Sequence, residues 1–147
     1  MRYLIAFLTC IALISVSSCR KDFSTIPNFG SLEFSKDTVF LDTVFTNIGS
    51  ATYNLNVYNR GNKAITIPKI VLESGTSSNY RLNVDGIPGK EFNDIDILGK
   101  DSIFVFVETT IDASNIADPL YTDRILFDTG TNQQDVDLIT LVQDAHF

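Results

Sequence analysis

The chain has 147 residues, of which 11 are basic and 18 acidic, so its formal net charge at neutral pH is −7. A chain of this length is expected to form one domain, and its Phe, Ile, Leu and Val residues suffice for a core. The acidic balance argues against nucleic acid as a partner, because proteins that bind its phosphates usually carry a basic face.

The start of the chain is predicted to be an export signal that lies outside the fold. Arg2 supplies a positive charge, and residues 3–16 carry no charge. This apolar run is shorter than the roughly 20 residues that a membrane-spanning helix needs. Its length is typical of the hydrophobic region of a signal peptide. We therefore assign residues 1–18 to the signal.

The signal ends in a motif that predicts a lipid anchor. Val16 to Cys19 resembles the lipobox of bacterial lipoproteins, with valine where leucine is commoner, and in that family the cysteine is acylated as the first mature residue. Cys10 would leave with the signal, so Cys19 would be the only cysteine of the mature chain and would have no disulfide partner. Cys19 is therefore predicted to be the lipid attachment site, which makes the membrane a partner. The alternative is an ordinary secretory signal that ends near a cysteine.

The residues after Cys19 bear on localisation. Cys19-Arg20-Lys21-Asp22 resembles the surface-export signal of lipoproteins from Bacteroidetes-type bacteria, although Phe23 stands where a second acid is expected. The resemblance implies an outer-membrane lipoprotein that is exposed on the cell surface; the inner leaflet is the alternative. Residues 19–31 lack periodicity and include Pro27, so we expect them to form a lipidated tether.

From Leu32 onward the pattern is typical of β-strands, with β-branched and aromatic runs between turn residues. The expected strands are 38–45, 52–59, 63–74, 80–84, 91–98, 101–112, 122–129 and 135–142. Pro68 indicates an edge, a bulge or a break, because proline has no N–H for a sheet hydrogen bond. The candidate for a helix is 113–121, which is short. The spacing predicts an all-β, antiparallel β-sandwich of seven or eight strands over residues 32–147.

The segment 101–112 is the most apolar of the expected strands. Ile103, Val105 and Val107 share one face, and Phe104 and Phe106 share the other. Apolar residues on both faces predict a central strand, with the second face covered by the tether, a loop or a neighbouring domain.

Three short motifs resemble immunoglobulin-like modules of the ASH-type and DUF1573-like groups. These are Leu32-Glu33-Phe34, the Asn-x-Gly turn at 57–61 (VYNRG) and the turn at 98–102 before a strong strand. The segments FSKDTVFLDTVFTNIGS, RLNVDG and VQDAHF resemble the N-terminal module of uncharacterised Bacteroidetes surface lipoproteins. The resemblance implies an immunoglobulin-like sandwich that is a solitary or truncated module. The family brings no catalytic residues.

The sequence has too few histidine and cysteine residues for the catalytic and metal-binding chemistry that depends on them. The only histidine is His146, and the only mature cysteine is predicted to be acylated, so neither a nucleophile–base pair nor a zinc site of His and Cys is expected. Calcium could use Asp85, the pair Asp94 and Asp96, or the pair Asp135 and Asp137, but solvated carboxylates are the simpler interpretation. We therefore expect no enzyme, no cofactor and no metal.

Aromatic side chains near loops leave a second interpretation open. Sugars stack on exposed rings, and Tyr58, Tyr80 and Tyr121 are the candidate ligand-binding residues. Packing in the rim or core of a Phe- and Tyr-rich sandwich is the alternative, and the chain has no tryptophan. The sequence thus predicts a lipid-anchored structural or interaction module with a protein partner. A carbohydrate-binding accessory lipoprotein is the alternative function.

Overall fold

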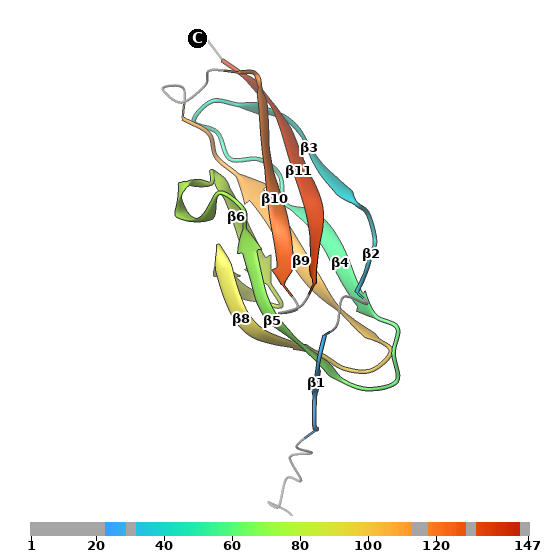
Figure 1. Ribbon diagram of the computed structural model, residues 1–147. Coiled ribbons are helices and arrows are strands. Elements are labelled where there is room, and N and C mark those ends of the chain that lie inside the picture. The colour runs from blue at the N-terminus through green and yellow to red at the C-terminus, as the bar shows by residue number, and fades with distance from the viewer. Residues whose placement is uncertain (1–22, 29–31, 113–117, 129–131, 145–147) are drawn as a thin grey trace, which may run out of the picture.

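The computed structural model describes residues 23–28, 32–112, 118–128 and 132–144, and these form two sheets packed face to face (Figure 1). Sheet A has the order β1-β5-β10-β11-β3, with β8 also paired to β5. Its strands are β1 (Ile26–Pro27), β3 (Thr38–Phe45), β5 (Ile65–Leu72), β8 (Glu91–Ile97), β10 (Leu120–Asp128) and β11 (Gln133–Gln143). Among the described residues no helix is long and apolar enough to cross a membrane.

Sheet B has the order β2-β4-β9-β6-β7. Its strands are β2 (Glu33–Phe34), β4 (Tyr53–Asn59), β6 (Tyr80–Val84), β7 (Ile87–Gly89) and β9 (Asp101–Thr109), and a single 3₁₀ turn, η1 (Gly75–Ser77), precedes β6. Asp85 and Gly86 both have positive φ angles, 50° and 87°, and close a two-residue hairpin between β6 and β7. The all-β sandwich that the sequence predicts is confirmed, and all eight expected strands are present.

The pairing is mostly antiparallel, with two exceptions that the sequence pattern does not reveal. β11 pairs in parallel with β3, and β1 pairs in parallel with β5. Parallel strands must be joined by a long connection. The alternation of residues within one strand does not show which other strand it pairs with, or in which direction. The purely antiparallel sandwich of the sequence analysis is therefore corrected at these two pairs.

Pro68 lies inside β5 and does not interrupt it. The alternation of buried residues shifts by one position there: Ile65 and Ile67 enter the core before the proline, and Ile70 and Leu72 enter the same core after it. The partner strand β8 turns in the same place, where Asp94 has a φ of 52°. A matched kink in both strands therefore accommodates the proline in an internal strand.

The expected tether is shorter in the structure, because β1 belongs to the sandwich. The Ile26 N–H donates to the Ala64 carbonyl (3.0 Å), the Asn28 N–H donates to the Thr66 carbonyl (2.9 Å), and Asn28 is buried. Two paired residues followed by a proline are too short for a periodic signal, which is why the sequence places this segment outside the fold. Residues 25–28 thus belong to the sandwich, which corrects their assignment to a tether; residues 19–22 and 29–31 lie outside the described residues.

The core lies between the sheets and is made of alternate residues from both. Phe127 of β10 is fully buried and packs on Phe34 of β2, with ring centroids 4.8 Å apart. Tyr80 of β6 crosses from sheet B to sheet A: its hydroxyl donates to the Tyr121 carbonyl (3.0 Å) and shares a second hydrogen bond with the Thr140 hydroxyl (2.9 Å). These contacts join the two sheets by packing and by hydrogen bonds.

Tyr80→Phe is expected to lower the free energy of unfolding by about 1–2 kcal/mol near neutral pH, because both hydrogen bonds of the phenol are lost. Burial raises the pKa of Tyr80 well above its ordinary value of 10.0. The folded state therefore keeps its proton above pH 10.0 while the unfolded chain loses it, and stability falls as pH rises, by up to about 1.4 kcal/mol per pH unit. Urea unfolding should show that the difference in free energy of unfolding between the unchanged protein and Tyr80→Phe narrows above pH 10.0. A difference that stays constant with pH would contradict this account.

Candidate binding surface on the outer face of sheet B

The candidate surface is centred on β9, which has β4 on one side and β6 on the other. Phe104 and Phe106 point away from the core and are 46% and 38% exposed. Their rings lie 6.0 Å apart between centroids with an angle of 11° between planes. The central position that the sequence predicts for this strand is confirmed. The predicted cover over its second face is wrong for the described residues, and a stacked aromatic pair faces outward.

Asparagine side chains border the aromatic pair. Asn56 lies opposite Phe104, while Asn54 and Asn83 lie on either side of Phe106. The Asn56 amide nitrogen donates to the Tyr58 hydroxyl (3.3 Å). Among the described residues the side-chain oxygens of Asn56 and Asn83 accept no hydrogen bond. Both oxygens are closed to solvent, and an unsatisfied buried acceptor costs roughly 1–3 kcal/mol. The exposed side chain among the three asparagines is that of Asn54.

Tyr58 continues this surface at its end next to Arg60. The Arg60 guanidinium lies 4.3 Å from the centroid of the Tyr58 ring. The same guanidinium donates to both carboxylate oxygens of Glu33, at 3.1 and 3.0 Å. These hydrogen bonds lower the pKa of Glu33 and raise that of Arg60. The Tyr58 ring is therefore held in place on the sheet, with a cation over one face.

Tyr80 and Tyr121 do not lie on this surface. Tyr80 is fully buried and stacks on Tyr121, with centroids 5.1 Å apart. The Tyr121 hydroxyl accepts a hydrogen bond from the Asn79 N–H (2.8 Å). The assignment of Tyr80 to ligand binding is wrong, because its phenol joins the two sheets and offers no ring face to a ligand. Of the three tyrosines chosen from the sequence, only Tyr58 lies on the outer face of sheet B.

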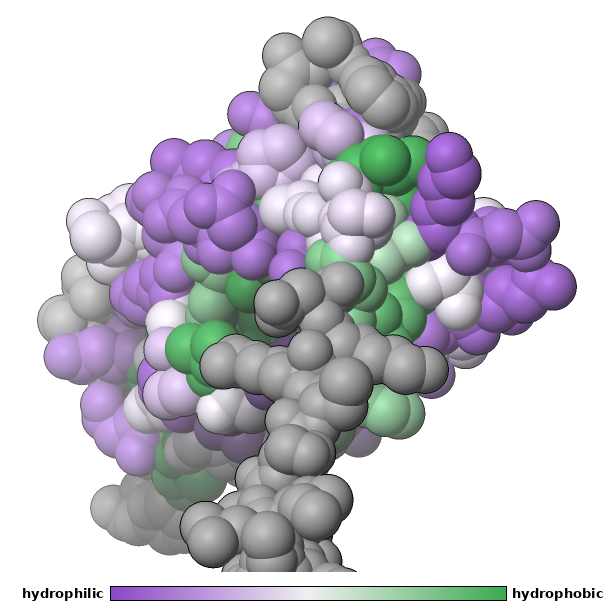
Figure 2. Space-filling model, turned by 90° about the horizontal axis from the view of Figure 1, so that it is seen from below, coloured by the Kyte–Doolittle hydropathy of each residue, from purple (hydrophilic) through white to green (hydrophobic). Residues whose placement is uncertain are grey.

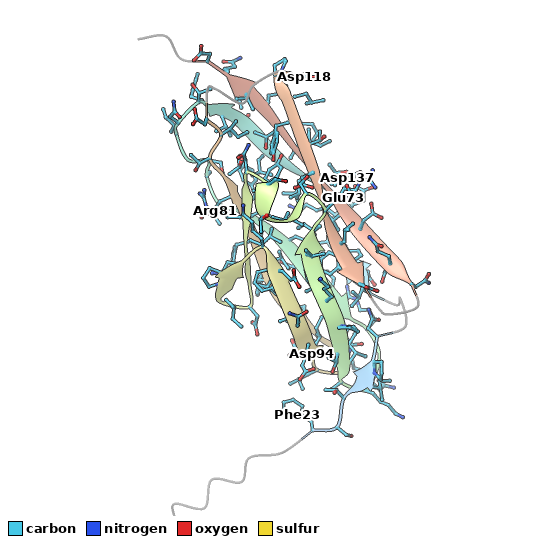
Figure 3. All side chains as sticks on the ribbon, turned by 60° about the vertical axis from the view of Figure 1, so that its left-hand side comes forward. Phe23, Glu73, Arg81, Asp94, Asp118 and Asp137 are labelled. Atoms are coloured by element: carbon cyan, nitrogen blue, oxygen red, sulfur yellow. The ribbon has the colours of Figure 1, made fainter. Side chains whose placement is uncertain are left out.

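A groove of about 320 Å³ crosses sheet A beside the end of β5. Glu73 and Asp137 lie close together there (Figure 3), and Arg124 lies between them, with its Nε 3.7 Å from the Glu73 carboxylate and 3.4 Å from that of Asp137. The single guanidinium offsets one of their two negative charges. Asp123 lines the same groove, is buried, and accepts a hydrogen bond from the Ser74 N–H (3.1 Å).

The aspartates considered for calcium are dispersed over the sandwich. Asp96 accepts a hydrogen bond from the Thr66 hydroxyl (2.6 Å), Asp137 lies beside Arg124, and Asp85 is in the β6–β7 hairpin. Within the described ranges no three His, Cys, Asp or Glu side chains gather as a metal site. Cys19 and His146 lie outside the described residues.

Phe104 and Phe106 are surface residues that the sequence reasoning missed, because it expected their face to be covered. Their alternation places them on one face, but whether that face is covered depends on the rest of the chain. Tyr80 could have been placed from the sequence, since it shares a face of its strand with Leu82 and Val84, both buried.

No protein-family model and no curated protein matches this chain. Among solved structures, it is similar to a family 123 glycoside hydrolase from Clostridium perfringens, studied for glycolipid glycan hydrolysis, with 11% identity and a TM-score of 0.52. The match covers 74% of this chain and 23% of the hydrolase, so the chain spans less than a quarter of that enzyme. A FixG-related protein from Vibrio parahaemolyticus matches with 11% identity and a TM-score of 0.44, over 66% of this chain and 81% of its own. At 11% identity the match to the hydrolase shows a shared fold and nothing further.

Proposed function

We propose that the chain is a lipid-anchored, non-catalytic module of the cell envelope that binds a partner through the outer face of sheet B. The observation that carries this proposal is the exposed, stacked pair Phe104 and Phe106 on the central strand of a sheet. Aromatic residues that are exposed together and contribute nothing to the core are typical of interaction surfaces. Asparagines lie opposite both rings, and the ion pair of Arg81 and Glu108 borders Phe106, so the contact would combine apolar and polar groups.

The anchor is proposed at Cys19, and the arrangement of the sandwich is compatible with it. The described chain starts at the end of the molecule that carries β1, and β11 ends at the opposite end (Figure 1). A lipid at Cys19 would therefore place the β1 end toward the membrane and extend the other end away from it. We propose the outer membrane, with the sandwich on the cell surface, from the resemblance of residues 19–22 to a surface-export signal.

Cys19→Ala is expected to move the protein from the membrane fraction to the soluble exported fraction, because the acceptor of the acyl chains is lost. Detergent phase partitioning and intact-mass measurement of the mature chain provide the readout. Cys10→Ala is the matched control, since that cysteine lies in the predicted signal and should leave fractionation unchanged. Unaltered membrane association of the Cys19 variant would remove the anchor hypothesis.

A photo-reactive residue at position 106 tests the binding surface. In intact cells, Phe106→p-benzoylphenylalanine should give a discrete cross-linked product, whereas the same residue at the exposed position Asp135 of sheet A should not. In the variant with the photo-reactive residue at position 106, the second substitution Phe104→Ser should abolish the cross-linked product. It should lower the melting temperature by no more than a few degrees. Equal products from both positions would show that sheet B is not the binding face.

Carbohydrate is the second candidate partner, and one observation favours it. Exposed rings can stack on sugars and amide side chains can bind sugar hydroxyls. The stacked pair Phe104 and Phe106 lies beside the exposed Asn54, with Tyr58 on the same face. Binding on a glycan array that is lost in Tyr58→Ala and Phe104→Ala would establish this alternative. Binding that both variants retain would place any glycan site elsewhere.

A further inference from the structure

We infer that the end of the sandwich that carries β1 rests directly on the lipid surface, with Leu98, Lys63 and Lys100 at the contact. This inference deepens the proposed function and depends on the anchor at Cys19. The contact surface, called here the membrane-facing end, consists of Phe23, Ile26, Lys63, Leu98 and Lys100. In Figure 3, Phe23 lies at the end of the molecule opposite Asp118.

Hydrogen bonds hold these residues together although they come from three parts of the chain. The β4–β5 turn and the β8–β9 turn meet at Asn59, whose amide donates to the carbonyls of Lys63 (2.8 Å) and Leu98 (3.0 Å). The Lys100 N–H donates to the Gly61 carbonyl (2.8 Å). β1 joins them because the Ile26 N–H bonds to Ala64, the neighbour of Lys63. The membrane-facing end is therefore a fixed surface.

Covalent geometry keeps this end close to the anchor. The Thr25 hydroxyl is hydrogen-bonded to that of Thr66 (2.7 Å), so the chain is fixed to sheet A from that residue onward. Five residues lie between Cys19 and Thr25, and a fully extended chain spans about 20 Å over the six steps from one to the other. An acylated Cys19 lies at the membrane surface, so the β1 end cannot move more than about that distance from it.

The chemistry of this end fits an interface between lipid headgroups and acyl chains. Phe23, Ile26 and Leu98 are exposed, and Lys63 and Lys100 are exposed beside them. Figure 2 looks at this end and shows apolar side chains gathered between polar ones. Apolar side chains can enter the headgroup layer while lysines reach the lipid phosphates. This pairing of side chains indicates a phospholipid surface as the occupant.

Electrostatics favours the same orientation. The chain from residue 19 onward has 10 basic and 18 acidic residues, since Arg2 leaves with the predicted signal, so most of its surface is repelled by anionic lipids. Near the contact, Glu33 is paired with Arg60 and Asp96 is bonded to Thr66, while Asp101 is exposed beside Lys100. The sequence places Arg20 and Lys21 between the anchor and this end. At the β1 end, Lys63, Lys100 and the ion-paired Arg60 accompany the carboxylates, whereas the chain as a whole is acidic.

Fluorophore quenching in vesicles tests the orientation. Leu98→Cys and Leu120→Cys each give the mature chain one free thiol when Cys19 is acylated, and the two leucines are 43% and 47% exposed at opposite ends of the sandwich. The full lipidated protein carries an environment-sensitive label in vesicles of phosphatidylethanolamine and phosphatidylglycerol that contain a nitroxide-labelled headgroup. Quenching at position 98 should be at least about threefold stronger than at position 120.

Lysine variants separate docking from anchoring. Lys63→Gln with Lys100→Gln should reduce the ratio of docked to undocked protein by up to roughly 30-fold, and added salt should act in the same direction. Arg81→Gln with Lys90→Gln, which removes two cations away from the β1 end, should leave quenching at 98 unchanged.

The outcomes distinguish this inference from the proposed anchor. A protein that is acylated and vesicle-bound but equally quenched at positions 98 and 120 overturns the docked orientation and leaves the anchor standing. A protein that mass measurement shows to be unacylated, and that does not bind vesicles, overturns the anchor and with it this inference.

Discussion

Phe127→Ala is expected to lower the free energy of unfolding by about 3–5 kcal/mol, a large part of the 5–15 kcal/mol that holds a typical domain together. Phe127 is fully buried on β10 and packs on Phe34 of the other sheet, 4.8 Å away between ring centroids. Removing the ring loses apolar burial and leaves a cavity between sheets that cannot close without moving β2. Urea unfolding followed by circular dichroism measures the loss.

Leu120→Ala is the matched control for this prediction. Leu120 lies on the same strand but is 47% exposed, so the change should cost no more than about 0.5 kcal/mol. A loss below about 1 kcal/mol for Phe127→Ala would show that the two sheets are not held together by this contact.

Asn59→Asp is expected to cost about 3–5 kcal/mol, because it places an unpaired carboxylate among backbone carbonyls. The Asn59 amide nitrogen lies 2.8 Å from the Lys63 carbonyl, 3.2 Å from that of Ile97 and 3.0 Å from that of Leu98. Its side-chain oxygen accepts the Gly61 N–H (3.0 Å). A carboxylate can keep the last bond but cannot donate any of the others. Urea unfolding measures this loss too.

Acidification provides an internal test of this explanation. A protonated carboxyl can donate one hydrogen bond, so the stability gap to the unchanged protein should shrink as pH falls through the raised pKa of the new group. Asn62→Asp, in the same turn but exposed, should change stability by no more than about 0.5 kcal/mol. A gap that does not depend on pH would attribute the loss to something other than the unpaired charge.

The Asn-x-Gly motif that the sequence analysis used for resemblance has a structural explanation in these contacts. Asn59 joins two turns, and a small residue fits at Gly61 because a Cβ there would lie 3.1 Å from the Asn59 side-chain oxygen, a tight contact. Gly99 of the second turn is more tightly placed: an added Cβ would lie 2.4 Å from the Asn62 carbonyl oxygen. The motif is therefore explained by the packing of two turns.

Strand positions could be predicted because their signal is local. The segments 38–45 and 80–84 match β3 and β6 to the residue, since alternate side chains of each strand enter the core. β1 could not be predicted in this way. It has two residues, one of them Pro27, and exists only because β5 offers a parallel edge.

The sequence by itself determined where the eight longer strands lie, how side chains alternate within most of them, and that Cys19 is the one cysteine after the predicted signal. These depend on a residue and its near neighbours. Only the tertiary structure decided that Tyr80 joins the two sheets, that Phe104 and Phe106 face outward, and that Lys63 and Leu98 share an end with β1. Exposure and proximity depend on which distant segments pack together, and a single strand's pattern does not contain that information.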